Sequence, residues 1–154
     1  MSLLVINADR FGGHTPPPGH PERPERQDVM HVVAERRRER GATVAEPEPA
    51  SREQILRVHT SSFVERLEAT AGSAVMLDPD TFTSPESWDV TRLAAGAAAM
   101  AVDAVLDGAA SRAAAWSGRR GITAARIAPA DSACSTTSPW RPRRRWRGAC
   151  PASR

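Results

Sequence analysis

Two histidines lie close together in a loop that is rich in proline and glycine. His14 and His20 are six residues apart, in a stretch from Gly12 to Pro24 that suits neither a helix nor an inner strand. Histidine pairs can bind a metal, but a zinc site needs three or four ligands, and no nearby Cys, Asp or Glu completes one. The spacing alone therefore favours histidines that face solvent or brace the loop.

Four other polar residues could carry chemistry, and each also has a plainer interpretation. Arg26 has the position of a surface residue early in a helix. Asp80 lies in a loop rich in Pro and Thr, where Asp commonly makes a local turn bond. His31 and His59 fall on helical stretches, where a packed structural histidine is the commoner case.

The basic character of the chain belongs to its last part. The whole chain has 154 residues and a formal net charge of +3. The segment from Ala113 onward holds nine Arg and one Asp, so it carries +8 and the first 112 residues carry −5. The run from Trp140 to Arg147 could bind nucleic acid through phosphate contacts and stacking. We keep this as the alternative function, although such charge runs are usually solvated.

Composition favours one cytoplasmic domain. The length suffices for a single core, and the sequence has no apolar run of about 18 residues, so we expect no membrane span. The N-terminus lacks a basic flank and a cleavage site. Cys134 and Cys150 fit no metal-ligand spacing.

The elements that must position these residues follow an α/β pattern. Pro, Gly and helix-capping residues indicate where each element begins and ends. The expected elements are a buried strand Leu3–Ile6, a helix Pro24–Arg40, a weak strand at Val44, a helix opened by the capping box Ser51–Gln54, a short helix from Ser61 or Ser62, and a helix from Ser84 to Gly108 whose middle, Ala94–Ala99, is nearly all small.

The segment from Ala113 does not continue this pattern. Neither helical nor strand periodicity persists, and apolar side chains are too sparse to offset the entropy of ordering. We therefore predict a partial domain over residues 1–112 and a disordered basic tail over 113–154.

Four motifs in order resemble the histone deacetylase superfamily, especially its bacterial acetoin-utilisation and polyamine-deacetylase branches. They extend over residues 1 to about 112. They are Gly19-His20-Pro21-Glu22-Arg23-Pro24-Glu25-Arg26, the segment Val58–Val64, the segment Leu77–Thr81 with Ser84 and Ser87, and Ala94-Ala95-Gly96-Ala97.

The resemblance implies an N-terminal fragment of an arginase-like, parallel-sheet deacetylase fold. Intact members use zinc to hydrolyse an acetyl-amide, in acetyl-lysine or acetylpolyamine, to an amine and acetate. By resemblance, His20, Pro21 and Glu22 shape the loop beside the pocket, and Arg26 lies in the cavity that holds acetate. Asp80 would accept hydrogen bonds from the substrate at the pocket rim, with Asp78 as the weaker candidate.

The catalytic motifs that should follow are missing. The family continues with R-P-P-G-H-H, which supplies the general bases, and then with a D-x-H element and a further Asp that bind zinc. It ends its catalytic set with a Tyr, and this chain contains no Tyr. We therefore expect no catalytic residue and no bound zinc here, and whether the chain is an enzyme at all stays open.

The tail fits the family when its codons are shifted by one base. In that frame, Ala115–Thr123 permits L-V-R-P-P-G-H-H, and Arg126–Trp140 permits D-R-A-G-G-F-C-L-F-N-N-V-A-V. We interpret this as a frameshift near Arg112 to Ala115, equivalent to one deleted base.

Overall fold

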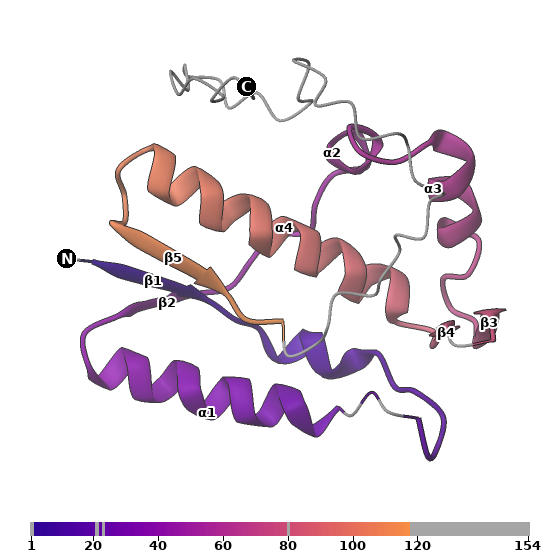
Figure 1. Cartoon of the computed structure of the whole chain (residues 1–154), viewed down its shortest axis with the longest axis horizontal. Coiled ribbons are helices and arrows are strands. Elements are labelled where there is room, and N and C mark those ends of the chain that lie inside the picture. Colours follow the sequence, from indigo (N-terminus) through magenta and orange to yellow (C-terminus); the bar gives the residue numbers. More distant parts are fainter. Residues whose placement is uncertain (1, 21, 23, 80, 118–154) are drawn as a thin grey trace, which may run out of the picture.

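The centre of the fold is a three-stranded parallel sheet (Figure 1). The computed structural model describes residues 2–20, 22, 24–79 and 81–117. Strands β1 (Leu3–Ile6), β2 (Thr43–Ala45) and β5 (Arg112–Ala115) lie in the order β2-β1-β5. The central strand β1 buries Val5 and Ile6 completely. This is what a short apolar run bounded by polar residues predicts for a strand covered on both faces.

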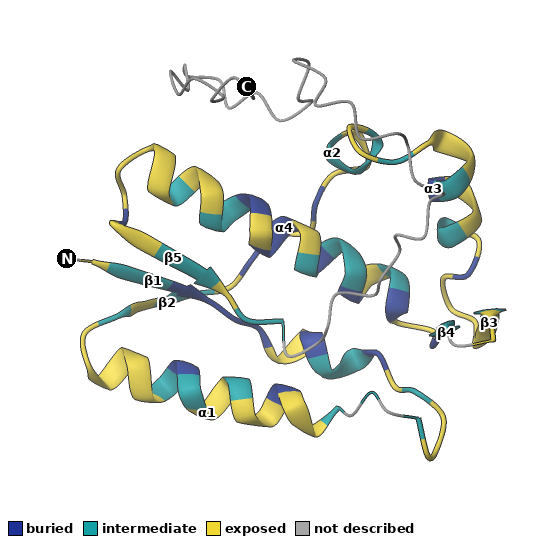
Figure 2. Ribbon diagram, viewed as in Figure 1, coloured by how far each residue is buried: buried dark blue, intermediate teal, exposed yellow. Residues whose placement is uncertain are grey.

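Two long helices cover opposite faces of the sheet (Figure 1). They are α1 (Glu25–Glu39) and α4 (Ser87–Leu106), and the short 3₁₀-helix η1 (Asp9–Gly13) leads away from β1. The main core lies between β1, η1 and α4, where the buried residues gather (Figure 2). Its buried members are Ile6, Ala8, Phe11, Val90, Leu93 and Ala97. Parallel strands between helices confirm the expected α/β class.

A separate group of short elements lies between β2 and α4 in the sequence. It comprises α2 (Arg52–Leu56), α3 (Ser61–Glu68) and an antiparallel hairpin of β3 (Val75–Asp78) and β4 (Thr81–Thr83). The capping box is present as expected, because the Ser51 hydroxyl accepts from the Gln54 amide at 3.1 Å and the Gln54 side chain accepts from the Ser51 amide. Helix α3 is capped by Thr60, one residue before the expected start.

Gly96 allows the chain to cross α4 closely. A Cβ at this position would collide with the Glu48 carbonyl and would lie 2.8 Å from the Ala50 nitrogen. Two hydrogen bonds hold this crossing in place. The Ala50 amide donates to the Arg92 carbonyl at 2.8 Å, and the Arg92 guanidinium donates to the Ala50 carbonyl at 3.2 Å. Gly96 therefore allows close packing, and the segment packed against it is a loop.

Two expectations about the elements are wrong. Helix α4 begins at Ser87, with Glu86 as its N-cap, three residues after the expected cap at Ser84. The Ser84 hydroxyl instead accepts from the amide of Thr15, and no side chain among the described residues caps α4. The supposed loop around Leu77–Thr81 is a hairpin. Its strands escape notice because each has only three or four residues.

The expected tail begins too early. Ala113–Ala115 form most of β5 and pair with Leu4–Ile6 of β1. An alanine run has weak strand preference by itself, and here pairing with a buried central strand decides the structure. The rest of the expected tail, from residue 118, lies outside the described residues. No helix in the described part of the chain is long and apolar enough to cross a membrane.

Candidate functional site

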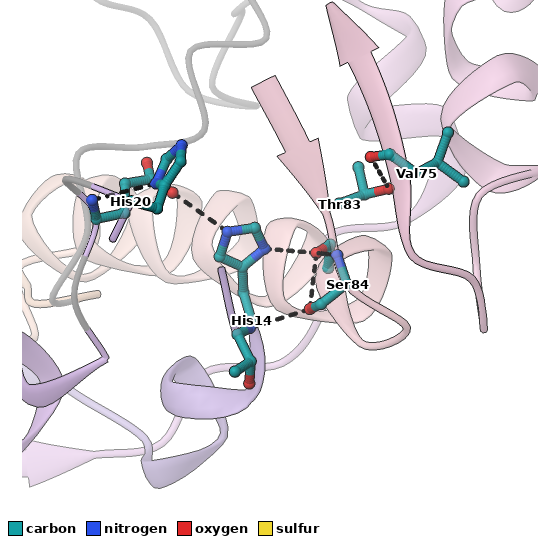
Figure 3. A network of polar contacts seen from close by, with 8 residues as sticks. His14, His20, Val75, Thr83 and Ser84 are labelled. Carbon is teal, nitrogen blue, oxygen red and sulfur yellow. Dashed lines mark hydrogen bonds and ion pairs between the residues drawn. The ribbon is translucent and has the colours of Figure 1, made fainter. Parts of the chain in front are cut away.

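A buried polar network joins the His-containing loop to the start of α4 (Figure 3). His14 is 1% exposed, and its Nδ1 lies 2.5 Å from the Ser87 hydroxyl. Its Nε2 lies 3.2 Å from a carboxylate oxygen of Glu22. Burial of an imidazole is tolerated when both ring nitrogens have partners, so His14 braces the loop and does not face solvent.

Two serines complete the network on the α4 side. The Ser87 hydroxyl accepts from the Ser84 amide at 2.7 Å and lies 3.1 Å from the Ser84 hydroxyl. The Ser84 hydroxyl accepts from the Thr15 amide at 3.1 Å. Both serines are at most 3% exposed. The loop after η1 is thus tied to Ser87 of α4 through His14 and to Ser84, just before α4, through Thr15.

The far end of the loop is shaped by a turn and by His20. The Pro17 carbonyl accepts from the His20 amide at 3.1 Å, and Gly19 between them has φ +83°. Pro followed by Gly with positive φ is typical of a type II turn. His20 Nδ1 in turn accepts from the Glu22 amide at 3.2 Å. His20 and Glu22 therefore do shape this loop together, while Pro21 lies outside the described residues.

A pocket of about 420 Å³ lies beside the loop's anchor. Arg10 lines it from η1, and Glu86, Asp89, Val90 and Leu93 line it from the start of α4. The charged residues are exposed and the two apolar ones are buried. The Glu86 carboxylate approaches Gly13 so closely that a Cβ on Gly13 would collide with it. The lining can orient a polar group by charge, and it includes no thiol, hydroxyl or imidazole to act as a nucleophile.

The remaining candidates are dispersed. Arg26 lies on the exposed side of the first turn of α1 and does not line this pocket. Asp80 lies outside the described residues, so its proposed place at the rim stays a prediction. Asp78 is exposed at the end of β3.

The other two histidines, His31 and His59, have different surroundings. His59 packs its ring against Phe63, with centroids 5.2 Å apart. The Nδ1 of His59 is buried and has no hydrogen-bond partner in the described part of the chain. His31 pairs with Asp9 at 3.0 Å on an exposed surface. His59 is packed as expected, but it lies in the turn between α2 and α3 and not on a helix. His31 does lie on α1, but it is exposed, so the expectation of a packed histidine is wrong there.

Zinc does not fit the residues that the structure describes. Among residues 2–20, 22, 24–79 and 81–117, no three His, Cys, Asp or Glu side chains converge to hold a metal ion. A zinc site needs at least three such ligands. We therefore derive no chemical step through zinc in this chain.

Sequence reasoning missed the partnership of His14 with Ser87. The two residues are 73 positions apart, and spacing within a loop cannot reveal so distant a partner. One signal was available: Ser84 and Ser87 stand three residues apart in a matched motif. Two small polar residues at that spacing before an apolar helix point to a buried hydroxyl pair as readily as to a cap.

The chain belongs to the histone deacetylase domain family, whose profile matches residues 20–122. The match includes the end of the Gly12–Pro24 loop, from His20 onward (the His20 loop), together with α4 and β5. It confirms the family inferred from the four motifs.

Three curated relatives come from one bacterium and two archaea. A "Histone deacetylase-like amidohydrolase" of Pseudomonas aeruginosa is 38% identical over 113 residues, 66% of this chain and 28% of that protein. A "Probable deacetylase" of Archaeoglobus fulgidus is 35% identical and matches 70% of this chain and 31% of its own length. A second "Probable deacetylase", from Methanothermobacter thermautotrophicus, is 47% identical over 62 residues, 40% of this chain and 19% of that protein.

A solved structure confirms the fold. The crystal structure of the HDA15 HD domain superposes with a TM-score of 0.65 at 23% identity, covering 75% of this chain and 35% of that one. The chain thus matches about a fifth to a third of the length of these curated relatives.

Proposed function

We propose that this chain is a truncated member of the deacetylase family that has no hydrolase activity of its own. Its intact homologues would remove the acetyl group from an amine, such as acetyl-lysine or an acetylpolyamine, with zinc as the cofactor. In this chain, His20, Pro21 and Glu22 would retain the loop beside the pocket, and Arg26 and Asp80 would retain positions for acetate and for the substrate rim.

One observation carries the proposal of inactivity. The family profile matches 20–122, yet the described residues bring no three metal-ligating side chains together. Hydrolysis of an amide at neutral pH by this family's chemistry requires a metal that polarises the carbonyl and activates water. A chain without the ligands would lack both effects.

The direct test is an assay of the purified 154-residue protein with an acetyl-lysine peptide and with an acetylpolyamine, each with added zinc. We expect acetate release at the level of the buffer blank, and no zinc retained after desalting, as measured by elemental analysis. The Pseudomonas aeruginosa relative, treated in the same way, serves as the positive control. Acetate release above the blank by this chain would overturn the proposal.

The proposed frameshift has its own test. Resequencing of the gene across the codons for Gly108 to Thr123 should reveal one missing base relative to a frame that encodes R-P-P-G-H-H. An unchanged sequence in independent isolates would make the lesion a natural one. A downstream frame with no family motif would contradict the frameshift.

The alternative is a non-enzymatic protein that binds nucleic acid through its Arg-rich segment. The nine Arg and single Asp after Arg112 favour it, since each phosphate contact adds salt-dependent affinity. A gel shift at low salt that disappears when the chain is cut after Ser117 would support it, and no shift would remove it. The cut belongs after Ser117 because an earlier one would remove β5. The cytoplasmic location also stays a prediction.

A further inference from the structure

The His14 network determines where the hydrogen of this imidazole lies. Its Nε2 faces a carboxylate oxygen of Glu22 at 3.2 Å. A carboxylate only accepts hydrogen bonds, so Nε2 must carry the hydrogen that joins them. The Glu22 side chain is 30% exposed and His14 only 1%, so this bond is made at the boundary between interior and solvent.

The other ring nitrogen, Nδ1, faces the Ser87 hydroxyl, which can either donate a hydrogen bond to it or accept one from it. Ser87 Oγ lies 2.5 Å from Nδ1 and already accepts from the Ser84 amide. When Nδ1 is bare, the Ser87 hydroxyl donates to it. When Nδ1 is protonated, the Ser87 hydroxyl accepts from it and turns its own hydrogen toward the Ser84 hydroxyl, 3.1 Å away.

The two serine hydroxyls therefore adapt to the ring, and the ring is oriented by Glu22. Ser87 is the first residue of α4, a helix packed in the main core. Glu22 lies at the same end of the loop as His20, whose Nδ1 accepts from the Glu22 amide. A rigid planar ring between them fixes the distance from the helix to the loop, which a flexible pair of side chains would not do.

We propose that His14 is a positioning residue, with its hydrogen held on Nε2, that transmits the position of the first turn of α4 to Glu22 and so holds the His20 loop in place. This goes beyond the proposed function, because it concerns how the loop is set and does not depend on whether any substrate is turned over. Without the His14 ring, the hydrogen bond from the Thr15 amide to the Ser84 hydroxyl would still hold the start of the loop, but this bond does not involve Glu22.

Nuclear magnetic resonance of the ¹⁵N-histidine-labelled chain tests the position of the hydrogen. The long-range ¹H–¹⁵N spectrum, recorded at a pH well above the ordinary pKa of histidine, distinguishes the two tautomers. The His14 signals are assigned by their loss in His14→Asn. We expect a proton on Nε2, and a form protonated on Nδ1 alone would overturn the proposal.

Three variants test the positioning. Glu22→Ala removes the group that orients the ring, so the Nε2–H form should lose its dominance and the second tautomer should appear. Ser87→Ala should shift the amide resonances of Thr15, Gly19, His20 and Glu22, while Ser87→Thr, which keeps the hydroxyl, should restore them. Ser87→Ala removes a buried hydroxyl and could therefore destabilise the fold. The amide signals of β1 report whether the variant is still folded. Unchanged loop resonances in Ser87→Ala, with β1 signals intact, would show a packing role only and overturn the proposal.

Discussion

At the scale of single residues, Gly96 and His14 each contact a segment that is distant in the sequence. The residues next to them in the sequence do not reveal these contacts. A helix interior ordinarily favours alanine over glycine by about 1 kcal/mol. Gly96 is retained here because the loop at Glu48 and Ala50 passes over its α-carbon. His14, in the same way, is explained only by a partner on a distant helix.

Gly96→Ala should reverse the usual sign of a glycine substitution. The new Cβ would meet backbone atoms, which cannot rotate away, so we expect a loss of about 1–3 kcal/mol in the free energy of unfolding. Urea denaturation followed by circular dichroism measures it. Ala98, an exposed residue of the same helix, supplies the control: Ala98→Gly should lose about 1 kcal/mol by propensity alone. Stabilisation by Gly96→Ala would contradict the close crossing.

Residue chemistry could be predicted from the sequence only where the partner is local. The Pro17–His20 turn and the Ser51–Gln54 capping box are complete within four residues, and the second was predicted correctly. The buried state of His14 depends on how η1 meets α4, and so the spacing left solvent exposure and bracing as equal alternatives. Glu22 and His20 were linked to one loop by resemblance, and their mutual hydrogen bond became visible only in the structure.

At the scale of elements, β5 is where the sequence was hardest to interpret. Its four residues, Arg-Ala-Ala-Ala, carry no β-branched or aromatic side chain. The helices, by contrast, were located within one to three residues, because caps and apolar spacing are local signals. The strand is stabilised by its pairing with β1, a contact between residues more than 100 positions apart.

Proline substitutions should distinguish the β5 amides that bond to β1 from those at the outer edge of the sheet. The amides of Arg112 and Trp116 donate to the carbonyls of Ser2, just before β1, and of Ile6, at its end. By alternation, the amide of Ala114 also faces β1 and that of Ala113 faces away. Ala114→Pro removes an amide that β1 uses, whereas Ala113→Pro removes one at the outer edge. We expect Ala114→Pro to reduce the free energy of unfolding by about 1–3 kcal/mol more than Ala113→Pro, measured by chemical denaturation. Equal effects would contradict the observed pairing.

The capping box of α2 offers a second test at this scale. Ser51→Ala removes the acceptor for the Gln54 amide and should reduce stability by about 1 kcal/mol. Ser73→Ala, at an exposed position outside helices and strands, is the matched control and should change little. Thermal unfolding of both variants provides the comparison, and a neutral Ser51→Ala would show that α2 contributes nothing to the cooperative unit.

At the scale of the whole molecule, burial is uneven. The core between β1, η1 and α4 is well covered, while α1 exposes Val29 and Val32 and the end of α4 exposes Val102, Val105 and Leu106 (Figure 2). Exposed apolar faces of this kind fit a chain that matches about a fifth to a third of the length of its curated relatives. Their existence could be predicted, but not their location, which depends on which face of each helix meets the sheet.

The same substitution at two leucines of α4 measures this unevenness. Leu93 is 2% exposed and Leu106 is 45% exposed. Leu93→Ala should therefore reduce the free energy of unfolding by about 2–5 kcal/mol, and Leu106→Ala by less than about 1 kcal/mol. Equilibrium urea denaturation gives both values. Similar losses at both sites would mean that the end of α4 is covered in solution.

The hydrogen bonds between Ala50 and Arg92 close a long stretch of chain at its base. Helices α2 and α3 and the hairpin all lie within that stretch, and its ends meet on α4 next to Gly96. The entropy of closing a loop rises only slowly with its length, so the exposed turn around Gly72 could gain or lose residues without moving the sheet. In evolutionary terms, this is where relatives can differ in length while keeping the same three strands in the same register.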